Sequence, residues 1–178
     1  MSRNYPLYGW IGAGLVSIFW LVNWLLDGPR SHWAFFFLWT GYSLAVDGLV
    51  FKRTGSSLVS RNWRRFLGLF FASMPAWWLF EILNQRVDNW TYIGVDFLSA
   101  PVYTLLSTLA FSTVMPAVFT TAELFASLAW FKKPRLGPRI KPDRQTTLGF
   151  FLLGWAMMIL LLSWQKVFFP FMWTSVYF

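Results

Sequence analysis

Cysteine is absent from this chain of 178 residues, and histidine occurs once, as His32. The lack of cysteine excludes disulfide bonds, thiolate metal sites and a cysteine nucleophile. One histidine excludes a metal site built from several imidazoles, and a serine–histidine–aspartate triad remains possible only if His32 itself serves. We therefore predict neither a metal site nor a cofactor.

Charged residues are also scarce. They make up 12% of the chain, whereas a soluble protein carries about 25%. Apolar residues make up 57%, and 20 phenylalanines and 13 tryptophans contribute to an aromatic share of 22%. A soluble domain of this size cannot bury so much apolar surface, because burial is limited by the ratio of surface to volume. The composition excludes a soluble globule, a disordered tail and a fibrous repeat, and predicts a polytopic membrane protein.

Apolar stretches of the right length for membrane helices occur five times. A helix rises 1.5 Å per residue, so about 20 residues cross a hydrocarbon core of about 30 Å. Pro116 predicts a kink within the fourth stretch. We therefore predict an all-α, polytopic transmembrane helix bundle, in a single domain over residues 1–178, with five full spans and a partial sixth. The full spans are residues 7–26, 33–51, 66–83, 102–124 and 147–164.

The partial sixth span is the apolar segment that follows Lys166. Twelve helical residues reach about 18 Å, well short of the core, so we expect the chain to continue beyond Phe178; a segment lying flat at the interface is the alternative. Residues 34–40 resemble residues 168–174, which suggests a parallel repeat of 7–44 by 147–178. Chance matching in a sequence rich in phenylalanine and tryptophan is the alternative. Four further pairs align without gaps: Gly9 with Gly149, Gly14 with Gly154, Leu21 with Leu161, and Trp24 with Trp164.

The net charge is +8, and the basic residues that produce it are distributed unevenly along the chain. If the N-terminus lies in the cytoplasm, twelve of the 15 basic residues fall on the inner side, as the positive-inside rule requires. We predict a multi-pass protein of the cell membrane with a cytoplasmic N-terminus. Its partners would be the bilayer and anionic headgroups, and not nucleic acid. The headgroups would bind along two loops, one from Lys52 to Arg65 and one from Lys132 to Arg144.

Glycines within the apolar spans form no phosphate-binding loop, and they predict close contacts between helices. Their small-xxx-small spacing is common at helix interfaces, and it leaves a homo- or hetero-oligomer open. The residues concerned are Gly9, Gly12 and Gly14, the pair Gly41 and Ala45, and the pair Gly68 and Ala72.

A polar stripe near the outer end of the third span begins at Glu81. If the helix continues, Asn84, Gln85 and Asp88 follow at i+3, i+4 and i+7, on one face. A carboxyl group under indole rings suits a general acid, since a water-poor setting favours its neutral form, and aromatic walls suit a polyene or a carbocation. An interfacial aromatic belt, with Glu81 paired to Arg86 or capping a helix, is the alternative. The nearby aromatic residues are Trp77, Trp78, Trp90 and Tyr92.

One stretch of the sequence contains Glu81-x-x-Asn84, then Asn89-Trp90-x-Tyr92, and then Pro101 before an apolar helix. This stretch resembles the lycopene cyclase domain of the heterodimeric membrane carotenoid cyclases. In that family paired glutamates follow the proline closely, whereas this chain continues with Val102, Tyr103 and Thr104. The pattern Trp77-Trp78-x-Phe80-Glu81-x-x-Asn84 is also similar to bacterial multi-pass membrane proteins without an assigned activity. The first resemblance implies chemistry on an isoprenoid.

Our first functional hypothesis is an intramembrane enzyme acting on an isoprenoid or another lipid at the outer leaflet. Glu81 would be the acid, with Asp88 or Asp96 as its partner and Asn84 beside it. The substrate would contact Trp77, Trp78, Gln85, Trp90, Tyr92 and Asp96. The alternative is a non-enzymatic scaffold or a transporter subunit. Because the polar residues near mid-span are few and uncharged, a proton-coupled pump is disfavoured. These residues are Asn23, Ser73, Thr108 and Ser112.

Two further acids, Asp47 and Glu123, lie near the predicted inner ends of their spans. Each could be a snorkelling acid paired with a cation from a basic loop. The alternative is a polar site that the two acids share at the inner face.

Overall fold

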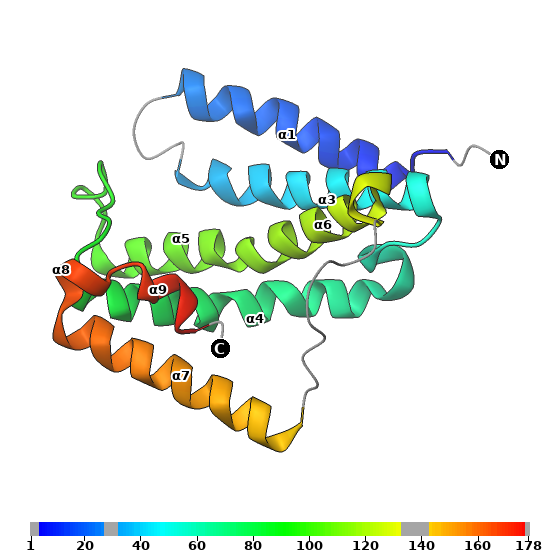
Figure 1. The fold of residues 1–178 in the computed structure, drawn as a ribbon. Helices are drawn as coiled ribbons and strands as arrows, with labels where there is room; N and C mark the ends of the chain where they lie inside the picture. Colours follow the sequence, from blue (N-terminus) through cyan, green and yellow to red (C-terminus); the bar gives the residue numbers. More distant parts are fainter. Residues whose placement is uncertain (1–3, 27–31, 133–142, 177–178) are drawn as a thin grey trace. The chain divides into compact units, whose positions relative to one another are not determined.

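The computed structural model describes residues 4–26, 32–132 and 143–176. This part of the chain contains helices and no strand, so the all-α prediction is confirmed (Figure 1). The elements are α1 (Leu7–Leu25), α3 (Ala34–Thr54), α4 (Leu58–Val87), α5 (Ala100–Ser112), α6 (Val114–Ser127), η1 (Ala129–Lys132), α7 (Arg144–Ser163), α8 (Gln165–Phe168) and α9 (Phe171–Thr174).

Five helical stretches among the described residues are long and apolar enough to cross a membrane. They are α1, α3, α4, the pair α5 and α6 taken together as Ala100–Ser127, and α7. Each corresponds to one predicted span, which is consistent with a multi-pass membrane protein. The segment predicted as part of a sixth span holds the two short helices α8 and α9.

Contacts divide the chain into two compact units. The first comprises Met1–Trp78 and Ile93–Lys133, and the second comprises Leu79–Tyr92 and Pro134–Phe178. The first unit holds the pairs α1 with α3 and α3 with α6, and the second holds α7 with α8 and α9. The predicted repeat and the single transmembrane domain stay predictions.

Glycines bring α1 and α3 together in the first unit. A Cβ atom on Gly12 would lie 2.5 Å from the backbone nitrogen of Ala45 and 2.6 Å from the carbonyl oxygen of Gly41. The predicted helix contact is therefore confirmed at Gly12 and Gly41. It is wrong at Gly14 and Gly68, because a Cβ atom there would meet nothing within 4 Å in the described structure.

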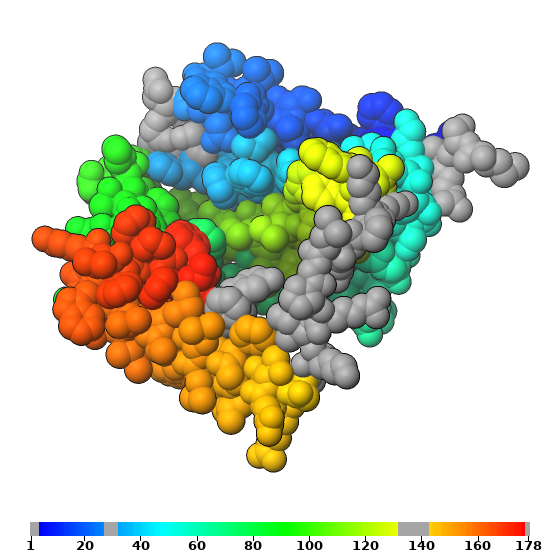
Figure 2. Space-filling view, viewed as in Figure 1, coloured from blue at the N-terminus to red at the C-terminus, as the bar shows by residue number. Residues whose placement is uncertain are grey.

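The outer side of α1 is apolar and exposed. Trp10, Ile18 and Trp24 each expose more than half of their surface, and the side chains of this helix stand at the surface of the first unit (Figure 2). Contacts with lipid chains would cover such a surface in a bilayer.

The helical run Ala100–Ser127 is interrupted at Thr113. This position lies in the turn before Pro116, where a proline ring disturbs the helix backbone, so the interruption agrees with the predicted kink. Ser73 of α4, which is only 1% exposed, bridges the break. Its hydroxyl donates to the carbonyl oxygen of Phe111 and accepts from the backbone N–H of Met115 at 3.1 Å. A neighbouring helix thus satisfies backbone groups that the interruption frees, as a membrane interior demands.

Candidate functional site

The loop after α4 is fastened by the side chain of Asn84. Its Oδ1 accepts from the backbone N–H groups of Asn89 at 2.9 Å and Trp90 at 3.3 Å. Its Nδ2 donates to the carbonyl oxygen of Trp90 at 2.7 Å. At Asp88 the chain takes a left-handed conformation, with φ of 50°. The amide of Asn84 therefore positions the Trp90 indole next to the last turns of α4.

The carboxylate of Glu81 receives two side-chain hydrogen bonds from this loop. Its Oε1 accepts from the hydroxyl of Tyr92 at 2.6 Å and from Nε1 of Trp90 at 3.3 Å. Glu81 is half-buried, and Tyr92 is exposed. The phenol and the indole orient a carboxyl group, which is a group that acid–base catalysis uses to transfer protons.

An aromatic wall stands beside this acid in the second unit. The Trp173 ring stacks on Trp90, with ring centroids 5.4 Å apart, and on Phe80, with centroids 5.1 Å apart. Phe80 and Trp90 in turn pack on a buried core formed by Leu83 and Val87 of α4, Leu161 of α7 and Met172 of α9. No sequence signal indicated that Trp173 joins the site, because it comes from a distant part of the chain that only the fold brings near.

Two of the predicted substrate-binding tryptophans belong to the first unit and pack there. The indole N–H of Trp78 donates to the hydroxyl oxygen of Thr108 at 3.0 Å. The rings of Trp77 and Trp78 lie against Phe111, with centroids 5.9 and 5.3 Å away. Asp96 belongs to the same unit and is exposed. These contacts tie the two indoles to α5.

The structure thus brings together four of the predicted site residues in the second unit: Glu81, Asn84, Trp90 and Tyr92. Gln85 and Asp88 lie in the same unit with exposed side chains.

A second polar cluster surrounds Asp47 of α3, which is 1% exposed. Its Oδ2 accepts from the hydroxyl of Tyr8 at 2.9 Å, and its Oδ1 accepts from the backbone N–H of Val59 at 3.2 Å. The hydroxyl oxygen of Ser57, a residue that directly precedes α4, lies 3.2 Å from that of Tyr8. The carboxylate therefore caps the first turn of α4, where a helix presents unpaired N–H groups and partial positive charge.

The prediction of acids paired with loop cations has two outcomes. It is confirmed for Glu123, which forms an ion pair with Arg61. It is wrong for Asp47, whose partners in the described structure are a phenol and a backbone N–H group. The N-terminus of α4 supplies the positive potential that a cation would otherwise provide.

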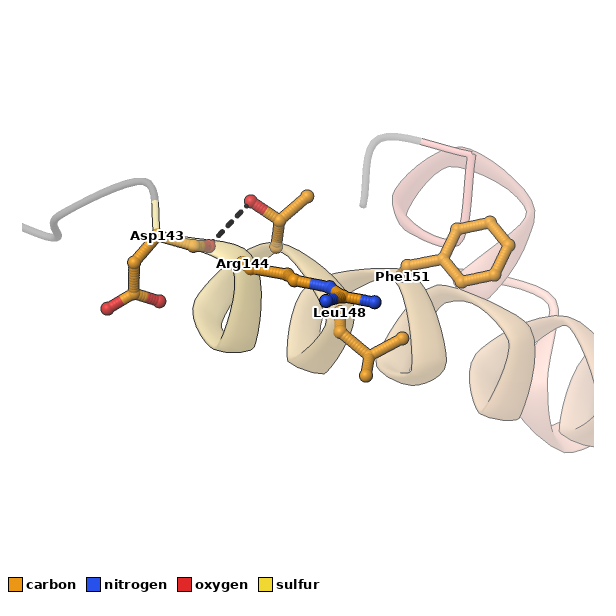
Figure 3. A pocket seen from close by; sticks show the side chains of 5 residues that line it. Asp143, Arg144, Leu148 and Phe151 are labelled. Atoms are coloured by element: carbon orange, nitrogen blue, oxygen red, sulfur yellow. Dashed lines mark hydrogen bonds between the residues drawn. The ribbon is translucent and has the colours of Figure 1, made fainter.

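A shallow hollow runs along the start of α7 (Figure 3). The hydroxyl of Thr147 donates to the carbonyl oxygen of Asp143 at 2.9 Å. The Asp143 carboxylate caps the helix by accepting from the backbone N–H of Thr146 at 2.7 Å, which holds the pKa of this carboxyl group below its ordinary value. All lining residues come from one end of one helix, so this hollow has a single described wall. They are Asp143, Arg144, Thr147, Leu148 and Phe151.

No family model, curated protein or solved structure matches this chain. The resemblance to the carotenoid cyclases stays a prediction.

Proposed function

We propose that the protein is an intramembrane enzyme that acts on an isoprenoid or another lipid at the outer leaflet, with Glu81 as its general acid. The hydrogen bond of 2.6 Å between the Tyr92 hydroxyl and the Glu81 carboxylate carries this proposal. A protonated Glu81 would deliver its proton to a double bond or a polar group of the lipid, and the Tyr92 hydroxyl would stabilise the remaining carboxylate by donating a hydrogen bond to it.

The surroundings of Glu81 support this role. Trp90 and Trp173 present aromatic surface, which stabilises developing positive charge and binds apolar chains. Asn84 holds Trp90 in place through two hydrogen bonds to its backbone and a third to the backbone N–H of the preceding residue, Asn89. In this proposal Asn84 is a positioning residue, and Gln85 and Asp88 remain candidates for contact with the polar end of the substrate.

The test is the substitution Glu81→Gln, which keeps the size of the side chain and removes its transferable proton. Thr91→Ala is a control in the same loop, at an exposed residue. Lipid extracts of cells that express each form would be compared by mass spectrometry. We expect the wild type and Thr91→Ala to produce the same altered lipid, and Glu81→Gln to produce at least about 100-fold less of it. Equal product from Glu81→Gln would refute the proposal.

A scaffold or transporter subunit without chemistry is the second candidate. The observation that favours it is that several polar side chains form hydrogen bonds that stabilise the fold. Asn84 fastens a loop, Asp47 caps a helix and Ser73 bridges a helix break. A lipid extract that is unchanged by expression of the wild type would favour this candidate.

We further propose that the protein crosses a bacterial inner membrane several times with its N-terminus in the cytoplasm, on the strength of the charge distribution. Because the chain lacks cysteine, single cysteines report topology without background. We expect a membrane-impermeant maleimide to label Thr91→Cys in intact cells, and to label Ser56→Cys only after the cells are permeabilised. The reverse pattern would overturn this orientation.

A further inference from the structure

The four arginines from Arg53 to Arg65 fall into two sets by their contacts, and the first set is used in packing. Arg61 forms the ion pair with Glu123 of α6. Arg53 donates from its Nε to the hydroxyl oxygen of Ser127 at 3.0 Å, and from its Nη2 to the carbonyl oxygen of the same residue at 3.5 Å. These two guanidinium groups hold the end of α6 against the end of α3 and the start of α4.

The second set faces outward. Arg64 and Arg65 are exposed, and the only ion pair among the described residues involves neither. The guanidinium carbon of Arg64 lies 5.5 Å from the ring centroid of Trp63, which is itself 57% exposed. We call Trp63, Arg64 and Arg65 the Trp63–Arg65 patch.

A break in α4 sets the position of this patch. Asn62 leaves the helical conformation, with φ of −164° and ψ of 95°, and its Oδ1 accepts from the backbone N–H of Arg65 at 3.1 Å. A new helical run therefore begins at Trp63 and continues into the apolar part of α4. The patch forms the first turn of this run, within the helix Leu58–Val87 that is long and apolar enough to cross a membrane. Arginine and tryptophan at the entry to a span are typical of the headgroup layer.

The chemistry of the patch matches one kind of ligand. Guanidinium groups bind phosphate through paired N–H donors, and an exposed indole at the entry to a span prefers the headgroup layer. We propose that the Trp63–Arg65 patch binds the phosphate of an anionic phospholipid, and that Arg53 and Arg61 take no part. Charge complementarity favours this occupant, since two guanidinium groups without an acidic partner in the described structure lie side by side on the chain.

The experiment titrates the full chain, purified in detergent micelles, with dansyl-labelled phosphatidylglycerol. Energy transfer from tryptophan to dansyl gives Kd, and dansyl-labelled phosphatidylcholine is the zwitterionic comparison. Removing one basic charge near a headgroup weakens binding about fivefold, so we expect Arg64→Gln with Arg65→Gln to raise the Kd for phosphatidylglycerol about thirtyfold. The Kd for phosphatidylcholine should stay unchanged.

The matched control replaces the internal ion pair, as Arg61→Gln with Glu123→Gln, and should leave the Kd for phosphatidylglycerol within about twofold of the wild type. Thermal unfolding shows whether each double variant is folded, and Arg64→Gln alone carries the test if the double variant is not. An unchanged Kd in the Arg64 and Arg65 variant, or an equal loss in the control, would overturn the proposal. The proposal would also be overturned if inorganic phosphate displaced more of the labelled lipid than chloride does at equal ionic strength.

Discussion

The closest approach of α1 and α3 makes a quantitative prediction for Gly12→Ala. The added methyl group would lie 2.5 Å from the Ala45 nitrogen and 2.6 Å from the Gly41 oxygen, whereas ordinary contact begins at 3.4 Å. Both neighbours are backbone atoms, so no side-chain rotation relieves the overlap, and the helices must separate by about 0.9 Å. Overpacking of this kind costs about 1–3 kcal/mol.

Gly14→Ala is the matched control on the same helix, because its methyl group would meet no neighbour within 4 Å. Both variants gain the same helix propensity, about 1 kcal/mol for alanine over glycine, so their difference isolates the steric effect. We expect Gly12→Ala to have a free energy of unfolding about 1–3 kcal/mol lower than that of Gly14→Ala. Titration of dodecyl maltoside micelles with sodium dodecyl sulfate, followed by fluorescence of the 13 tryptophans, measures both. Equal stability of the two variants would refute the close contact.

Three further predictions use the polar contacts. Asp47→Ala should lower the free energy of unfolding by about 2–4 kcal/mol in the same titration, because the Val59 N–H loses its acceptor, and Asp47→Asn should cost less. Ser73→Ala should cost about 1–3 kcal/mol and speed amide exchange at the break between α5 and α6. The Asp143 carboxylate should stabilise the first turn of α7 above its ordinary pKa, and this contribution should vanish as the pH falls through its lowered folded-state pKa. The NMR chemical shift of the Thr146 amide should change with pH as the Asp143 carboxylate titrates, and this change should be absent in Asp143→Asn.

The five spans could be predicted because a bilayer imposes length and apolarity on any helix that crosses it. The start of α4 could not. The sequence predicted a span from residue 66, yet the helix begins at Leu58, where the carboxylate of Asp47 caps polar residues that carry no hydropathy signal. The interruption at Thr113 lies in the turn before Pro116, where the sequence predicted a kink, but the hydroxyl that bridges it belongs to another helix and could not be predicted.

The candidate site was also predictable only in part. Glu81, Trp90 and Tyr92 could be grouped from sequence, since one helix end and a short loop keep them close. The partnership of Trp90 with Trp173 could not, because it depends on how α9 packs against the end of α4. The role of Asn84 also required coordinates, since helical spacing shows the face that an amide occupies and not the loop atoms that it binds.

The cap at Asp47 also has a consequence for the order in which the chain assembles. Its two donors lie 39 residues before it and 12 residues after it, whereas the ion pair between Arg61 and Glu123 must wait for 62 further residues. Domains emerge from the ribosome N-terminal part first. The one buried carboxylate among the described residues can therefore receive both of its hydrogen bonds while only α1, α3 and the first turn of α4 exist. The later helices then pack against a pair of helices, α1 and α3, in which the buried carboxylate of Asp47 already has its hydrogen-bond donors.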